Sequence, residues 1–223
     1  MQTSMPKRFG SRQEAGRALA KRLAVFTATD AVVLALPKGG ITVGAEIARL
    51  LQLPFDVLLM DRITVPGCGV TPLGAITGGG VRMLNAAMID QLHLSDDVVR
   101  GAVLRKALRL ARRERLYRSR HPSVDVADRT VILVDDGTSS CATLSNAIRL
   151  LRRQHAEQVV VAVPVTCQHA ACDLRMEADE VVALEEPAAE TSPRKWFESF
   201  PPTTAAEARR ILSEEFEEAD HHN

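Results

Sequence analysis

The sequence predicts an α/β protein built on a doubly wound parallel sheet, and two observations support this prediction. Short apolar runs rich in β-branched residues alternate along the chain with helical patterns, which is typical of parallel α/β sheets. The run 131–134 is apolar at every position, as expected for a strand buried on both faces. A chain of 223 residues has room for one such domain with a sizeable core. We therefore expect a single domain over residues 1–223.

The individual elements follow from these patterns. Ser11 and Glu14 form a capping-box pattern that opens a helix reaching to about residue 26. Residues 61–80 are rich in Gly, Pro and Thr and should form a flexible loop and a hairpin around three consecutive glycines. Residues 185–223 should form a small hood and a C-terminal helix. Strands are expected at 31–36, 55–60, 131–134, 158–163 and 180–184, and further helices at 42–51, 95–117, 142–154, 167–175 and 205–217.

Composition gives no reason to expect a nucleic-acid or membrane partner. Lys+Arg and Asp+Glu both number 28, so the net charge is zero, and aromatic residues make up only 4% of the chain. No apolar run approaches the roughly 20 residues that a membrane span needs. The four cysteines lack the spacing of a disulfide framework, and no signal peptide is visible. We therefore expect a cytoplasmic protein.

The segment 131–143 contains the most informative motif. An apolar strand ends on two adjacent carboxylates, Asp135 and Asp136, and small residues then lead into a helix that begins at about Ala142. Open α/β sheets bind ligands at the carboxyl ends of their strands. The N–H groups at a helix N-terminus favour an anion, whereas carboxylates accept hydrogen bonds from sugar hydroxyls or hold Mg²⁺. A pentose 5-phosphate satisfies both halves of this motif.

A second strand, turn and helix repeat this logic nearer the N-terminus. The buried run ending at Leu36 is followed by Pro37-Lys38-Gly39-Gly40, in which two glycines allow the backbone to approach an anion closely and Lys38 adds a positive charge. Taken alone, this pattern also describes an ordinary turn with a lysine in solvent. Its position ahead of the acidic strand, in a βαβ context, favours a second anion site.

These two motifs resemble those that bind phosphoribosyl diphosphate (PRPP) in type I phosphoribosyltransferases. The resemblance is closest to a predicted bacterial subgroup of that family, and it extends from Arg8-Phe9-Gly10 to Trp196-Phe197-Glu198. It implies a PRPP-dependent pentosyltransferase, a glycosyltransferase of nucleotide metabolism. Such an enzyme uses Mg²⁺ and transfers ribose 5-phosphate to a base or another nitrogenous acceptor, releasing diphosphate.

The resemblance also implies roles for individual residues. Asp135 and Asp136 would hold the ribose hydroxyls and the metal, and Lys38, Gly39 and Gly40 the diphosphate. The 5-phosphate would lie on the following loop, formed by Gly137, Thr138, Ser139, Ser140, Cys141, Ala142 and Thr143.

Two further segments would complete the site. The segment 61–76 occupies the place of the family's flexible catalytic loop, and there Arg62, together with Lys38, would act on the leaving diphosphate. In the hood, Trp196 and Phe197 either form a wall for the base or simply pack the C-terminal segment on the sheet.

Several residues depart from the family pattern. Ser140 and Cys141 replace the usual Thr-Gly, Val70 replaces a glutamate, and Ser139 replaces the aspartate of purine-salvage enzymes. The Cβ of Cys141 would stand where a phosphate approaches, and a thiol at a helix N-terminus tends toward a depressed pKa. These departures favour an alternative, a non-catalytic PRPP or nucleotide sensor with a degenerate site. Hydrolysis of a phosphoester or diphosphate is a third possibility.

The long helix expected at 95–117 has one apolar stripe and one face crowded with arginines between Arg105 and Arg115. Such a face can be simply solvated, can contact another subunit or a phosphate-rich ligand, or can bind nucleic acid. Because the chain has no net charge to keep copies apart, we expect a homodimer in which these arginines meet the acidic residues 214–220 of the other copy.

Overall fold

The computed structural model describes residues 8–37, 39–65, 72–118 and 122–220, with only the backbone of residues 216–220. Its centre is a five-stranded sheet in the order β2-β1-β6-β7-β8, in which every neighbouring pair is parallel. The strands are β1 (Val32–Ala35), β2 (Phe55–Val57), β6 (Thr130–Val134), β7 (Gln158–Val165) and β8 (Glu180–Glu185).

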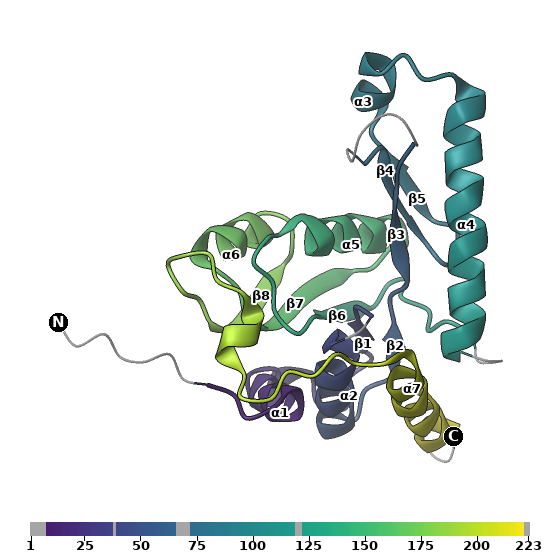
Figure 1. Cartoon of the computed structure of the whole chain (residues 1–223). Helices are drawn as coiled ribbons and strands as arrows, with labels where there is room; N and C mark the ends of the chain where they lie inside the picture. Colours follow the sequence, from purple (N-terminus) through teal and green to yellow (C-terminus); the bar gives the residue numbers. More distant parts are fainter. Residues whose placement is uncertain (1–7, 38, 66–71, 119–121, 221–223) are drawn as a thin grey trace.

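Helices cover both faces of this sheet, as Figure 1 shows. Helices α1 (Arg12–Arg22), α2 (Gly39–Leu51) and α7 (Ala205–Asp220) lie on one face, where Leu19, Ile47 and Leu212 are buried in one apolar cluster. Helices α5 (Ala142–Arg153) and α6 (Gln168–Arg175) lie on the other, where Leu144 and Leu174 are buried in a second cluster. The predicted doubly wound parallel sheet is confirmed.

The central strands form where the sequence is apolar at consecutive positions. All of β1 and residues 131–134 of β6 are buried, and these two strands pair in register from Val32 with Val131 to Ala35 with Val134. The expected helix starts and ends differ from those observed by a few residues. Ser11 caps α1 by accepting from the Glu14 N–H, but α1 ends at Arg22 and a 3-10 turn, Ala24–Phe26, follows.

The segment after β2 differs most from the prediction. The strand expected at 55–60 ends at Val57, and Met60 opens a new strand, β3 (Met60–Ile63), in a second sheet. This antiparallel sheet has the order β3-β4-β5, with β4 (Gly74–Thr77) and β5 (Arg82–Leu84) forming the predicted glycine hairpin. A short helix, α3 (Ala86–Gln91), was not predicted. The long helix α4 (Asp96–Arg118) was, and it packs along the second sheet.

Two segments that are far apart in the sequence, around Phe9 and around residues 193–200, meet beside α1. A 3-10 turn, η2 (Pro193–Trp196), leads to Phe197, whose backbone forms a parallel bridge with Phe9. The rings of Phe9, Trp196 and Phe197 are buried together, and Phe200 packs against them. In the part of the chain that is described, no helix combines the length and apolar character needed to cross a membrane.

Candidate active site

The strand order creates a crevice between β1 and β6. From β1 the chain runs into α2 on one face of the sheet, and from β6 it runs into α5 on the opposite face. This is the topological switch point at which doubly wound sheets bind ligands, outside the carboxyl ends of the strands. The glycine turn after β1 and the carboxylates after β6 meet there.

Gly39 and Gly40 are packed directly against the acid pair. A Cβ added to Gly39 would lie 1.7 Å from Oδ2 of Asp136, and one added to Gly40 would lie 3.2 Å from Cα of Asp135. A side chain at Gly39 would therefore displace the Asp136 carboxylate. These close approaches place the start of α2 directly beside the two carboxylates.

Arg12 is a site residue that the sequence reasoning missed. Its Nε donates to Oδ2 of Asp136 at 2.8 Å, and its Nη2 lies 2.7 Å from the same oxygen. The guanidinium also donates to the carbonyl of Pro201 at 2.6 Å and stacks 3.6 Å from the ring centre of Phe200. Its side chain is only 8% exposed, so Arg12 holds Asp136 and the hood in one fixed arrangement.

Asp135 has less charge compensation than Asp136. Its Oδ1 accepts from the Asp136 N–H at 2.9 Å, while the Arg12 guanidinium contacts the other carboxylate. Burial, and then the charge of Asp136, raise the pKa of Asp135 to about 8. A cation placed between the two carboxylates would relieve both effects.

This pKa makes the stability of the metal-free protein depend on pH. Because the pKa of Asp135 is about 8 in the folded state and 3.8 when unperturbed, the folded state binds the extra proton between these values. The contribution of Asp135 to stability is therefore greatest at low pH and is lost as pH rises toward about 8. In EDTA, Asp135→Asn should raise the urea midpoint more at pH 8 than at pH 5. A constant difference from wild type across this range would contradict the prediction.

The loop after the acid pair is shaped by Gly137 and Thr138. Gly137 has φ +121°, and a Cβ there would lie 2.8 Å from Cβ of Pro193 in the hood. The Thr138 N–H donates to the Val165 carbonyl, and its hydroxyl binds both the N–H and the carbonyl of Ser140. The hydroxyl of Thr138 is thus used within the loop, whereas Ser140 and Thr143 are exposed.

Cys141 differs from what the sequence predicted. It adopts an ordinary right-handed conformation, φ −72° and ψ −19°, so glycine is not required there. Its Sγ lies 3.5 Å from Oδ2 of Asp173 on α6. Burial and the Asp173 carboxylate raise the pKa of the thiol, whereas the helix N-terminus led us to expect a lower one. The thiol points toward α6, and α5 begins without a side-chain cap.

Other predicted site residues do not join this cluster. Lys38 and Val70 lie outside the described residues. Arg62 is on β3 with an exposed side chain and belongs to none of the acid-pair contacts given above. Trp196 and Phe197 are 8% and 5% exposed within the aromatic cluster of the hood, which favours packing over contact with a base.

Comparison with known proteins agrees with this geometry. Residues 10–197 match the family model of the phosphoribosyl transferase domain, and the chain therefore belongs to that family. It is 37% identical over 207 residues to two Mycobacterium tuberculosis proteins, MT0597 and Rv0571c, each named "Putative phosphoribosyl transferase". That alignment covers 92% of this chain and 46% of each relative, so the chain spans about half the length of these relatives.

A solved structure is similar over nearly the whole chain. The crystal structure of TT1426 from Thermus thermophilus is 33% identical in sequence, with a TM-score of 0.81. The match covers 93% of this chain and 98% of that one. The second sheet and the hood thus belong to an arrangement that another protein shares.

Proposed function

We propose that this protein is a PRPP-dependent phosphoribosyltransferase that transfers ribose 5-phosphate to a nitrogenous acceptor and releases diphosphate. The observation that supports this most is the contact of Gly39 and Gly40 with Asp136 and Asp135 at the switch point of the sheet. A glycine turn suited to an anion and a carboxylate pair suited to a diol stand side by side. PRPP carries both groups on adjacent carbons of one sugar.

Each part of PRPP has a complementary group in the crevice. The carboxylates of Asp135 and Asp136 accept hydrogen bonds from the ribose hydroxyls. The 5-phosphate binds the loop 137–143, where the uncapped N-terminus of α5 offers backbone N–H groups and Ser140 and Thr143 offer exposed hydroxyls. The diphosphate binds the N–H groups of Gly39 and Gly40, with Lys38 beside them.

The reaction breaks the bond between C1 of ribose and the diphosphate oxygen and forms a bond from C1 to the acceptor nitrogen. The electron pair leaves with diphosphate, so catalysis needs positive charge and N–H donors at that group and exclusion of water from C1. We propose that Lys38 and the N-terminus of α2 supply this charge, together with Arg62, which is exposed on β3 and outside the acid-pair contacts. The acceptor nitrogen loses its proton in the same transfer, and the proton passes to water or to the released diphosphate.

Mg²⁺ fits the donor set at this site. The pair Asp135 and Asp136 offers carboxylate oxygens, which suit a hard cation. Burial and then the charge of Asp136 raise the pKa of Asp135, and a bound cation would favour its ionised form. Asp135, together with the Asp136 oxygen that Arg12 does not hold, would bind the ion. When bound, Mg²⁺ neutralises charge on the diphosphate.

We also propose one domain over residues 1–223, a cytoplasmic location and a homodimer.

Calorimetry with PRPP and Mg²⁺, followed by an assay of diphosphate release over a panel of bases, tests the proposal. We expect Asp135→Asn and Asp136→Asn to weaken PRPP binding at least about 10-fold, since each removes a charged hydrogen-bond acceptor. The matched control is Asp90→Asn, an exposed aspartate on α3. PRPP binding without diphosphate release for any acceptor favours the sensor, and absence of PRPP binding rejects both functions.

A further inference from the structure

Helix α4 buries one face and leaves the opposite face open. Val99, Ala102 and Leu110 are buried toward the second sheet and α7, and Lys106 Nζ lies 3.6 Å from Oδ1 of Asp61 on β3. Figure 1 shows α4 along one side of the molecule, with the second sheet on its inner side. The acidic helix α7 packs against α4 and α2 of its own chain.

Exposed apolar side chains are concentrated on α4, with Leu104 and Leu108 on its outer face and Val98 and Leu116 on one flank. Leu104 and Leu108 are each 60% exposed, Leu116 is 56% exposed and Val98 41%. Among the described residues these are four of the seven large hydrophobic side chains that are exposed. So dense an apolar patch on one helix is typical of an interaction surface.

The outer face has the spacing of a helix-pairing seam. On the face of α4 opposite Lys106, successive residues of a single stripe are spaced alternately four and three apart in the sequence. This is the spacing of residues through which one helix packs against another. The positions on this stripe are Asp97, Gly101, Leu104, Leu108, Ala111 and Arg115. The two leucines stand at its centre, with a small residue on either side of them and a charge at each end.

This stripe is complementary to itself when reversed. The positions of the stripe form pairs at equal distances in sequence from residue 106. Leu104 and Leu108 lie two residues away on either side, Gly101 and Ala111 lie five away, and Asp97 and Arg115 lie nine away. Two antiparallel copies related by a two-fold axis at residue 106 would therefore place leucine on leucine, small residue on small residue, and aspartate on arginine. Val98 and Leu116, on one flank, come close together in the same arrangement.

We propose that a second copy of this chain docks on this surface, with the two α4 helices antiparallel and crossing at residue 106. Asp97 is 89% exposed and pairs with Arg100 of its own helix at 2.8 Å. In the dimer its carboxylate also faces Arg115 of the partner subunit, a charge complementarity that fixes both direction and register. Arg105 and Arg112 flank the stripe and carry like charges, so the apolar centre supplies most of the affinity. This arrangement differs from the expected contact with residues 214–220, and its apolar centre should make the dimer less sensitive to salt than that contact would be.

Sedimentation equilibrium of the whole chain tests the surface. We expect Leu104→Glu/Leu108→Glu to raise the dimer dissociation constant at least about 100-fold, because four leucines per dimer lose their contacts. The matched control is Met176→Glu, since Met176 is 84% exposed on another part of the molecule and its replacement should leave the dimer intact. Wild-type protein that stays monomeric, or a double variant that stays dimeric and folded by circular dichroism, overturns the proposal.

A mixing experiment tests the register without touching the leucines. Asp97→Lys alone sets lysine against arginine at both ends of the dimer, and Arg115→Glu alone sets glutamate against aspartate. An equimolar mixture restores both opposite-charge pairs, so we expect heterodimers to dissociate at least about 5-fold less readily than either variant alone. A mixture with no preference for the heterodimer overturns the antiparallel register.

Discussion

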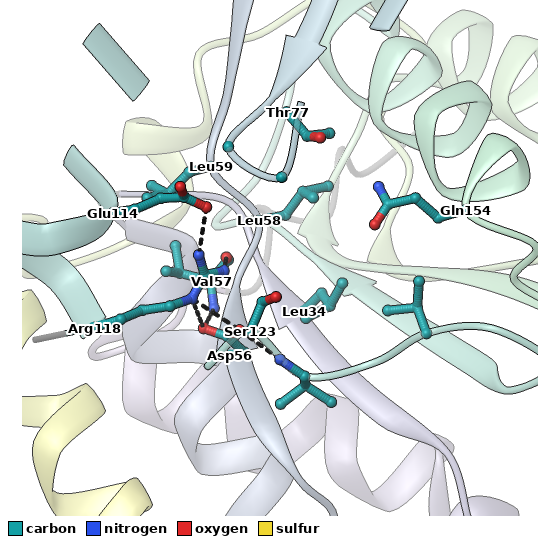
Figure 2. Close-up of a pocket in the computed structure, with 14 residues that line it drawn as sticks. Leu34, Asp56, Val57, Leu58, Leu59, Thr77, Glu114, Arg118, Ser123 and Gln154 are labelled. Atoms are coloured by element: carbon teal, nitrogen blue, oxygen red, sulfur yellow. Dashed lines mark hydrogen bonds and ion pairs between the residues drawn. The ribbon is translucent and has the colours of Figure 1, made fainter. Parts of the chain in front are cut away.

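Replacement of Asp56 by asparagine is expected to lower the free energy of unfolding by about 3–5 kcal/mol, because it removes the more deeply buried of the two carboxylates that pair with the Arg118 guanidinium. Asp56 is 1% exposed, and both of its carboxylate oxygens accept from Arg118 Nε at 3.0 Å. They also accept from the N–H groups of Val57 and Val124 at 2.7 and 3.1 Å. Figure 2 shows this cluster beside a small cavity of about 50 Å³.

The Arg118 guanidinium joins three parts of the fold. Besides Asp56, it donates to the Val57 carbonyl at 2.7 Å and to Glu114 at 2.9 Å. Glu114 in turn lies against Gly78, where an added Cβ would be 2.1 Å from its Oε1. The last turns of α4, the end of β2 and the turn of the hairpin are thus connected through one buried network, which fixes the second sheet on the first.

Urea unfolding of a double-mutant cycle measures this effect. Asp56→Asn/Arg118→Met should be less destabilised than the sum of the two single variants, because it removes both charges together. The control is Glu214→Gln, which breaks the exposed pair with Arg210 and should change stability by less than about 1 kcal/mol. A loss below about 1 kcal/mol for Asp56→Asn would show that water in the cavity compensates the charge.

The sequence predicted the parts of the fold that local pattern determines. The β-branched runs indicated the central strands, and the small residues after Val134 marked the start of α5. The second sheet was missed in part, because Asp61 and Arg62 interrupt the apolar run of β3 with charges. Asp61 is accommodated there by Lys106 on α4, a partner that no local pattern reveals.

Local sequence pattern also predicted the central part of the candidate site. The acid pair and the glycine turn follow strands, and the rule for parallel sheets brings strand ends together. Arg12 was missed because its partner, Asp136, lies far along the chain. One signal was available: a basic residue in the first turn of a helix opposes the helix dipole, and this suggests a carboxylate nearby. Similarly, periodicity alone could not tell which arginine of α4 turns inward to Asp56.

Gly39→Ala is expected to abolish most PRPP binding while leaving the fold largely intact, on the assumption that the crevice is the PRPP site. The new Cβ would lie 1.7 Å from Oδ2 of Asp136 and 2.6 Å from Nε of Arg12. Because the end of a side chain can rotate away, the clash moves the Asp136 carboxylate and breaks its pair with Arg12. A displacement of about 1 Å at a positioned group can reduce activity roughly 100-fold, so we expect a loss of about that size in diphosphate release.

Calorimetry with PRPP and Mg²⁺, together with thermal unfolding, separates this effect from misfolding. Gly79→Ala is the matched control, because nothing lies within 4 Å of a Cβ at Gly79 in the hairpin turn, and it should bind PRPP as wild type does. A Gly39→Ala protein that binds PRPP with wild-type affinity would show that the acid pair tolerates displacement or lies outside the PRPP site. If Gly39→Ala instead binds PRPP more weakly and melts near the wild-type temperature, the effect is local to the site. Glycine is then needed at position 39 because the Asp136 carboxylate occupies the space that a side chain would fill.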